Sequence, residues 1–181
     1  MEPYFGFSKI GYLQELCNKY GDFRVAKGWV GTNGDIRWTK HFTVMECWQS
    51  DEGLKFLETV NNRGGLDAEV RIDIDSEGRT PEAVKKHFDD ACDKLESMDK
   101  SYLGFHSGSK GYHIHIFFDD LVLKDQATIR AFKSNLVSQL GGEMLKVNNS
   151  PMLTLEWAPN NKTGKPKLPI RGTAEWLDVD K

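Results

Sequence analysis

The sequence predicts an α+β protein whose larger part is a β-α-β-β-α-β unit, preceded by a smaller α/β segment. Three observations lead to this fold class. After residue 68, short stretches of alternating apolar and polar residues indicate four strands. Longer stretches with apolar residues at helical spacing follow the first and the third of these strands. Glycine, asparagine and proline lie at the boundaries between the stretches, as expected for turns and helix ends.

The composition limits the size and setting of the protein. A chain of 181 residues with a net charge of −3 forms one domain, or one domain with a small appendage. Cys17, Cys47 and Cys92 match neither a zinc-binding spacing nor a disulfide framework, so we expect no zinc and a reducing, cytoplasmic setting. We identify no signal peptide and no membrane span. The charge argues against coating nucleic acid by bulk attraction, but it permits a local basic groove.

Residues 1–67 are predicted to form a small α/β extension packed on the core. Ser8 and Ser50 are suitable helix N-caps, and Gly21 is suited to end the first helix. The expected elements are a helix over residues 9–20, strands over residues 23–30 and 42–48 with a turn at 32–35 between them, and a helix over residues 51–60.

Residues 68–181 are predicted to form the core. The expected elements are strands over residues 68–75, 102–106, 112–118 and 153–157, and helices over residues 81–98 and 126–140. Thr80 and Asp125 are the expected N-caps of the two helices. Their order is that of the ferredoxin-like fold, which RNA-recognition domains share. In such a sheet the first strand usually lies between the third and the fourth, so we expect residues 68–75, 112–118 and 153–157 to be neighbours.

The strand over residues 68–75 ends in two acidic residues that share a face. Alternation places its apolar residues on one face and Asp73 and Asp75 on the other. The two carboxylates lie about 7 Å apart along the strand, so both can reach one or two divalent cations. Taken alone, the pair is also compatible with a solvated strand face.

The next candidate groups lie on the strand over residues 112–118 and on the turn before it. His113 and His115 share one face of this strand. The turn contains two glycines, which expose backbone N–H groups, and Ser109 and Lys110 add donors and positive charge. Such a concavity suits a phosphate group. The alternative is a pair of polar residues on a half-exposed strand.

The last predicted strand places Glu156 opposite its apolar residues, and a polar, basic loop over residues 158–167 follows it. If the expected sheet order holds, one face carries five titratable groups: Asp73, Asp75, His113, His115 and Glu156. Repulsion and desolvation of such a group would cost several kcal/mol without a cation. A pair of magnesium or manganese ions would offset this cost.

Together, these motifs resemble those of the catalytic core of the archaeo-eukaryotic primase superfamily. That family has a strand ending in Asp-x-Asp, a Ser-Gly-x-x-Gly-x-His turn and strand, and an acidic residue followed by a basic loop. The matching segments are Asp73-Ile74-Asp75, residues 107–113 and residues 156–172. The last two are also similar to the polymerase domain of bacterial non-homologous end-joining ligases. The resemblance covers roughly residues 68–175.

The resemblance implies a template-directed nucleotidyltransferase, a DNA primase or polymerase that joins nucleoside triphosphates with two Mg²⁺ or Mn²⁺ ions. The implied metal ligands and catalytic residues are Asp73, Asp75 and Glu156. The implied nucleotide-binding residues are Ser107, Ser109, Lys110, His113 and Arg171, with His115, Asn161 and Lys165 as accessory candidates. The candidates for a template groove are Trp157, Lys162, Lys165 and Lys167. Implied partners are a single-stranded DNA template or primer-template and a helicase or accessory primase subunit, in prokaryotic or viral replication.

Two other functions fit parts of the pattern. Nicking enzymes of the rolling-circle and relaxase type also place a His-hydrophobic-His strand in a ferredoxin-like sheet. They need a tyrosine nucleophile on a later helix, and no tyrosine follows Tyr112. A non-catalytic, RNA-recognition-like domain would show exposed aromatic residues on its sheet, where this sequence has carboxylates and histidines.

Overall fold

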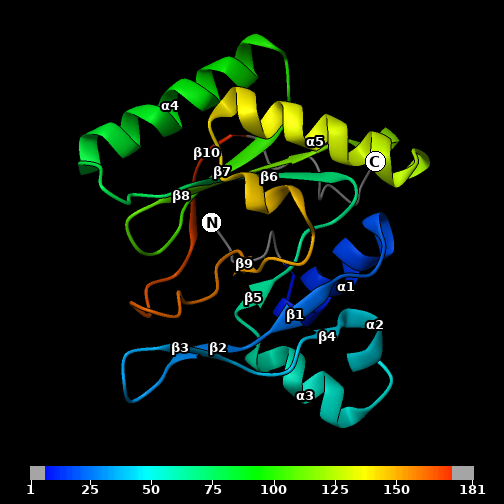
Figure 1. The fold of residues 1–181 in the computed structure, drawn as a ribbon. Coiled ribbons are helices and arrows are strands. Elements are labelled where there is room, and N and C mark those ends of the chain that lie inside the picture. The colour runs from blue at the N-terminus through cyan, green and yellow to red at the C-terminus, as the bar shows by residue number, and fades with distance from the viewer. Residues whose placement is uncertain (1–6, 173–181) are drawn as a thin grey trace.

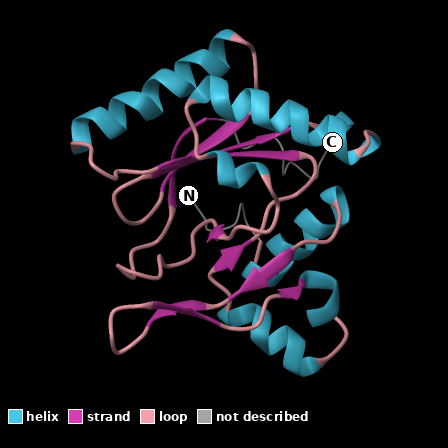
Figure 2. Cartoon of the chain, in the orientation of Figure 1, coloured by secondary structure: helices cyan, strands magenta, loops and turns pink. Residues whose placement is uncertain are grey.

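The centre of the molecule is a four-stranded antiparallel sheet with the strand order β10-β7-β8-β6 (Figure 1). The computed structural model describes residues 7–172. The strands of this sheet are β6 (Glu69–Ile74), β7 (Tyr102–His106), β8 (Tyr112–Phe117) and β10 (Leu168–Gly172). Two helices, α4 (Pro81–Ser97) and α5 (Gln126–Leu140), cover one face of it (Figure 2). Both helices were predicted from the sequence, and their caps are those expected: Thr80 and Asp125 accept backbone N–H bonds in the first turn.

The N-terminal half, residues 7–67, packs under the other face of this sheet (Figure 1). Its helices are α1 (Lys9–Tyr20), α2 (Val44–Cys47) and α3 (Asp51–Thr59). Its strands are β1 (Arg24–Ala26), β4 (Phe42–Thr43) and β5 (Asn62–Arg63), in a sheet of order β4-β1-β5-β9. A separate hairpin, β2 (Gly28–Val30) and β3 (Ile36–Trp38), projects beside it. Two 3₁₀ turns, η2 (Asp119–Leu123) and η3 (Met144–Val147), flank α5.

In the four-stranded sheet, β6, β7 and β8 are largely buried on both faces, whereas the edge strand β10 is partly exposed. On one face, Val70, Ile72 and Ile74 pack with α4 and α5, as the alternation predicts. On the other, Leu103 and Phe105 join the apolar core of the N-terminal half. An α+β fold was predicted and is confirmed. The boundary at residue 67 stays a prediction; β9 (Leu153–Thr154), from beyond it, pairs with β5, and residues 173–181 of the predicted core lie outside the described residues.

The predicted strand over residues 42–48 is wrong beyond its second residue, because a helix begins at Val44. Thr43 caps this helix in a capping box, in which its side chain accepts from the Glu46 N–H and Glu46 accepts from the Thr43 N–H. This local pair outweighs the β-propensity of the apolar residues around it. The predicted strand over residues 23–30 is also divided, into β1 and β2.

The predicted pairing of residues 68–75 with residues 112–118 is confirmed, but the predicted fourth strand and its place in the sheet order are wrong. Only Leu153 and Thr154 are extended, and they pair with β5 in the other sheet rather than with β6. The fourth strand of the core is β10, which pairs with β7 at the far edge, so β6 is an edge strand bonded only to β8. Residues 155–157 turn away, with Trp157 at a φ of +60°. The alternating pattern of residues 153–157 predicts a strand, but it reflects only that several of these side chains are buried. A turn buries them as well as a strand would.

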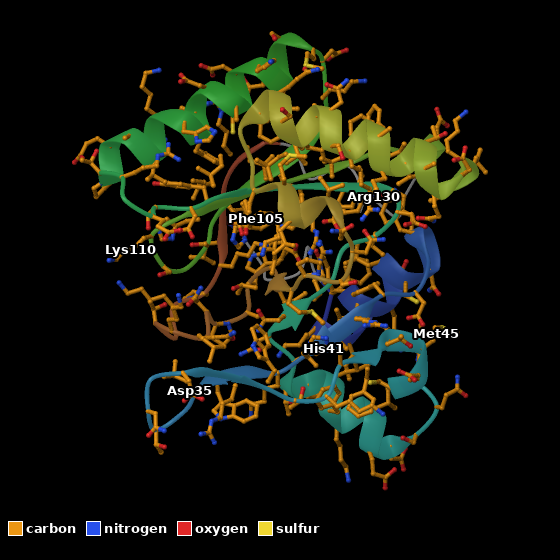
Figure 3. The ribbon with its side chains drawn as sticks, in the orientation of Figure 1. Asp35, His41, Met45, Phe105, Lys110 and Arg130 are labelled. Carbon is orange, nitrogen blue, oxygen red and sulfur yellow. The ribbon has the colours of Figure 1, made fainter. Side chains whose placement is uncertain are left out.

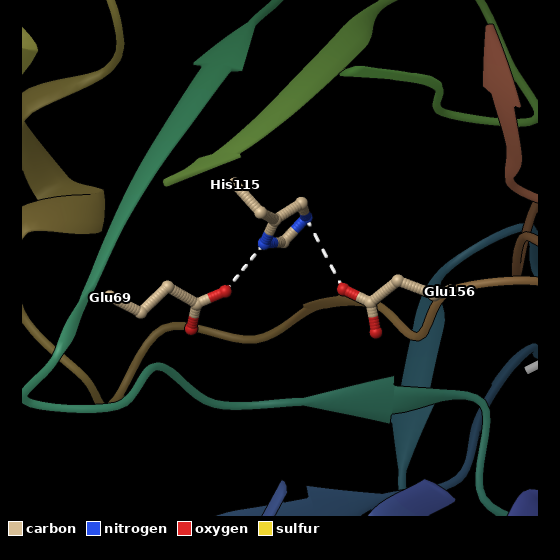
Figure 4. A group of neighbouring side chains, drawn as sticks. All are labelled: Glu69, His115 and Glu156. Carbon is tan, nitrogen blue, oxygen red and sulfur yellow. Dashed lines mark hydrogen bonds and ion pairs between the residues drawn. The ribbon is translucent and has the colours of Figure 1, made fainter. Parts of the chain in front are cut away.

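Arg63 on β5 links the two sheets through a buried ion network (Figure 4 shows the acidic residues and His115). Its guanidinium donates to Glu69 on β6 over 2.6 and 2.8 Å, and to Glu156 over 2.8 and 3.0 Å. The side chains of all three residues are at most 1% exposed. Burial alone would raise the pKa of Glu156, but Arg63 and Lys167 outweigh it and hold that pKa below its ordinary value.

His115 and Lys167 complete this network. The Lys167 ammonium lies 2.7 Å from His115 Nε2, so we assign the imidazole proton to Nδ1, which donates to Glu69 over 2.5 Å. Burial and the charge of Lys167 lower the pKa of His115 to about 4, so the ring is neutral at pH 7. Burial lowers the pKa of Lys167 to about 8, which leaves it mostly charged. Two cations therefore balance two carboxylates around a neutral histidine.

Arg63→Met should destabilise the protein by about 3–5 kcal/mol, because it leaves Glu69 and Glu156 buried without their cation. The matched control is Arg37→Met, since the Arg37–Asp35 pair is half-exposed and such pairs contribute about 1 kcal/mol or less. Urea unfolding of the two variants and the parent measures the difference. Equal stability of Arg63→Met and Arg37→Met would contradict the role given to the network.

Candidate active site

A cavity of about 560 Å³ opens where the ends of β6 and β8 meet the turn over residues 107–111. Asp73 and His113 are direct cross-strand partners, so both side chains point from the same face of the sheet. Asp75, just after β6, also lines the cavity. The predicted site residues that line it are Asp73, Asp75, Ser107, Ser109, Lys110, His113 and Asn161.

Asp73 is mostly buried and lies among charged groups. Its Oδ1 is 3.5 Å from His113 Nε2, and its Oδ2 is 3.6 Å from the ammonium of Lys146 on η3. Burial raises the pKa of Asp73 to about 6; Lys146 opposes the rise, and Glu143 and Asp75 add to it. A carboxylate with so high a pKa is one that a further cation would stabilise.

His113 carries an unsatisfied atom. Within residues 7–172, its Nδ1 is buried and has no hydrogen-bond partner. Burial and the charge of Lys167 hold the pKa of His113 well below its ordinary value, so the ring is neutral. Because buried polar atoms nearly always have a partner, this unsatisfied atom marks His113 as a candidate functional residue.

The turn over residues 107–111 is held in shape from within and from outside. The Ser107 hydroxyl accepts from the N–H groups of Ser109 and Gly111 over 3.3 and 3.2 Å. Gly108 has a φ of +83°, and a Cβ there would lie 2.5 Å from the Lys165 carbonyl, so only glycine fits. Asn160 donates to the Ser107 carbonyl over 3.1 Å. The turn and the loop after Glu156 therefore form one wall of the cavity.

Three predicted residues do not reach this cavity. Glu156 and His115 are bound in the Arg63 network, and in the described part of the chain Glu156 forms no three-residue ligand group with Asp73 and Asp75. The reason is the turn at residues 155–157, which takes Glu156 off the sheet. Lys165 is exposed and meets the turn only through its backbone.

Arg171 is also placed elsewhere, on the α4 side of the sheet. Its guanidinium bonds Asp93 and Glu96 of α4 over 2.6 and 2.9 Å. A bulge in β10 between Pro169 and Arg171 shifts the pairing, so Arg171 lies opposite Gly104 of β7 instead of Leu103. In a regular pairing without a bulge, Arg171 would lie opposite Leu103, whose side chain points to the cavity side of the sheet. Of the template-groove candidates, Lys167 is fully buried and Trp157 packs edge-on to Phe105.

Sequence reasoning missed several residues of the site and its support. Lys146, Ile36 and Trp38 line the cavity, and Arg63 and Glu69 form the network. Glu69 was detectable, since it shares the Asp73 face of its strand by alternation. Arg63 and Lys146 lie in segments whose position depends on tertiary packing, and no local pattern identifies them.

Two carboxylate groupings in the structure bear on metal binding. Ligand atoms of Glu69, His115 and Glu156 lie within 4.8 Å of one another, a spacing that a metal ion can bridge (Figure 4). An ion there would have to displace Arg63 or Lys167, which already balance the charge. Asp73 and Asp75 offer oxygen ligands in an open cavity. Because burial raises the pKa of Asp73, a cation bound there would stabilise its ionised form. This pair fits Mg²⁺ or Mn²⁺.

Comparison with solved structures identifies the fold. Over 97% of this chain and 84% of the other, it matches the polymerase domain of Mycobacterium tuberculosis Ligase D in complex with DNA, with a TM-score of 0.59 and 14% identity. Over 90% and 87%, it matches the AEP domain of the cyanophage S-2L primase-polymerase, with a TM-score of 0.55 and 16% identity. The chain has the fold of a primase-polymerase catalytic domain.

The fold also matches the primase RepB', with a TM-score of 0.55 and 13% identity over 91% of this chain. The chain spans 57% of the length of that primase, and 85% of its catalytic domain, which was solved with initiator DNA. No family model matches this chain, and no curated protein matches it by sequence. No helix within the described residues is long and apolar enough to cross a membrane.

Asp73→Asn should stabilise the metal-free protein near neutral pH. Asp73 has a pKa of about 6 when folded against an ordinary 3.8, so the folded state binds more protons between these values. Its contribution to stability is complete below pH 4 and is lost as the pH rises through 6, by about 3 kcal/mol for two pH units. In EDTA, the variant should melt several degrees above the parent at pH 7.5, and this advantage should vanish at pH 4.

The surface variant Asp120→Asn is the control for this measurement, because Asp120 is exposed and lies outside the cavity. It should melt with the parent at both pH values. An advantage of Asp73→Asn that is the same at pH 4 and pH 7.5 would show that the carboxyl does not have a raised pKa.

Proposed function

We propose that this chain is a template-directed nucleotidyltransferase of the primase-polymerase type, which joins nucleoside triphosphates on a DNA template. One observation carries the proposal: the cavity brings Asp73 and Asp75 together with the donors of the turn over residues 107–111. The primase-polymerase fold supports it. The solved complexes of similar domains with DNA support DNA as the partner.

In this proposal Asp73 and Asp75 hold two Mg²⁺ or Mn²⁺ ions. Such ions lower the pKa of an attacking 3′-hydroxyl and neutralise the departing pyrophosphate. Glu156, expected from the sequence as a third ligand, is left in the Arg63 network. Lys146 keeps Asp73 charged and oriented before the ions bind, because its ammonium lies 3.6 Å from the carboxylate.

The phosphate-binding groups would act mainly by positioning. Lys110 and Ser109 line the cavity, and their ammonium and hydroxyl groups would hold the triphosphate in line with the attacking hydroxyl. His113 lines the cavity and would contribute a polar contact to a phosphate oxygen. Ser107 would act through the turn, since its hydroxyl is used by Ser109 and Gly111.

Asp73→Asn and Asp75→Asn should each abolish nucleotide incorporation, because each removes a charged metal ligand. The assay incubates the protein with a single-stranded template, labelled nucleotides and Mn²⁺, with and without a primer. Asp120→Asn, a surface carboxylate change, should leave synthesis unchanged. Synthesis that survives in both active-site variants would remove the two aspartates from the metal site, and products without a primer would identify priming activity.

His113→Ala should weaken nucleotide binding by about tenfold and leave DNA binding nearly unchanged, because the lost contact is to the triphosphate. Calorimetry with a nucleotide and Mn²⁺ measures the first quantity, and fluorescence anisotropy with labelled single-stranded DNA measures the second. A larger loss in DNA binding than in nucleotide binding would place His113 on the template path instead.

A further inference from the structure

The candidate cavity has two chemically different ends. The end formed by β6, β8 and the turn over residues 107–111 carries carboxylates, an ammonium and a histidine. The other end is formed by the β2–β3 hairpin, which lies on the far side of the loop over residues 155–167 from β6 and β8 (Figure 1), and it carries Ile36 and Trp38. A ligand that fills the cavity therefore has a charged part and a flat or apolar part.

The hairpin register decides which of its side chains face this cavity. Trp38 pairs with Gly28 and Ile36 pairs with Val30, so these four positions share one face. Trp29 pairs with Arg37 on the opposite face. Trp29 and Trp38 are both 41% exposed, yet only Trp38 lines the cavity. The hairpin therefore carries Trp38 on the face toward the cavity and Trp29, equally exposed, on the opposite face.

The hairpin is fixed at its base. The Asn61 carboxamide accepts from the Gly28 N–H over 2.8 Å and donates to the Gly28 carbonyl over 2.9 Å, both in buried positions. The missing side chain of Gly28 leaves room for Asn161, whose amide would lie 2.4 Å from a Cβ there. Asn161 also accepts from Asn62 over 2.9 Å. Trp38 is therefore held at a fixed place relative to the loop that supports the turn over residues 107–111.

The tip of the hairpin and the turn over residues 107–111 project on the same side of the molecule. Figure 3 shows this arrangement through Asp35, near the tip, and Lys110, in the turn. A molecule entering from this side meets Lys110 and Trp38 together, since both line the cavity.

We propose that Trp38, with Ile36 beside it, binds the base of the incoming nucleotide by stacking while the turn over residues 107–111 binds its phosphates. This proposal rests on the proposed function and adds to it a base-binding surface. A nucleoside triphosphate has the required shape, because its charged tail and its flat base lie at opposite ends. Base–aromatic stacking tolerates any base, so this surface contributes affinity without selecting a sequence.

The test is calorimetric titration with Mn²⁺ and either dATP or inorganic triphosphate, without a template. Trp38→Ala should lower the affinity for dATP by about tenfold, the effect of one lost stacking contact, and leave inorganic triphosphate binding unchanged. Trp38→Phe should keep most of the dATP affinity. The matched control is Trp29→Ala, on the other hairpin face, which should bind both ligands as the parent does. Thermal melting confirms that each variant is folded.

Several results would overturn the base-binding role. Equal losses in Trp29→Ala and Trp38→Ala would do so, as would a Trp38→Ala loss that is equal for dATP and inorganic triphosphate. A Trp38→Ala defect confined to single-stranded DNA binding would assign the tryptophan to the template. If the parent binds inorganic triphosphate and Trp38→Ala changes nothing, only this inference fails. If the parent binds neither ligand, the proposed function fails with it.

Discussion

The Arg63 network is the interaction on which the arrangement of the cavity depends. One guanidinium from β5 neutralises Glu69 of β6 and Glu156 of the following loop, and Lys167 adds its charge on the other side of His115. These contacts fix the N-terminal half against the four-stranded sheet and hold both ends of the loop over residues 156–167. That loop supports the turn over residues 107–111, and the N-terminal half carries Trp38. The network also reaches the cavity wall directly, because Lys167 donates to the carbonyl of Thr154 over 2.9 Å and Thr154 lines the cavity.

The sequence predicted the parts of this fold that local patterns determine. The helices capped by Ser8, Thr80 and Asp125 and the strands of residues 102–106 and 112–117 follow from capping and alternation, and so does the shared face of Asp73 and His113. Sheet order was not predictable in this way, because β10 comes from a segment that resembled a basic loop. Arg171 was misplaced for a similar reason: one bulge residue reverses the face of a side chain, and no local pattern marks the bulge. Glu156 was expected as a metal ligand and is bonded to Arg63 instead, because whether a buried acid meets a metal or an arginine depends on residues far away in the chain.

The alternative functions fit the structure less well. The two histidines of the nicking-enzyme pattern are separated in this structure, because His115 is bound between Glu69 and Lys167 while His113 lines the cavity. An RNA-recognition domain would expose the face of its sheet to bind bases. Here Leu103 and Phe105 of that face are covered by the N-terminal half, and the cavity lies at the end of the sheet that carries Asp73. The charged end of the sheet, rather than its face, is available to a ligand.

The most direct test of this account is the position of bound metal in a crystal soaked with Mn²⁺ and a non-hydrolysable nucleotide. Anomalous scattering locates manganese independently of the protein density. The account predicts manganese peaks at Asp73 and Asp75, with the triphosphate extending toward Lys110 and His113, and an intact Arg63 network. Manganese bound among Glu69, His115 and Glu156, with Arg63 displaced and the Asp73 cavity empty, would contradict it.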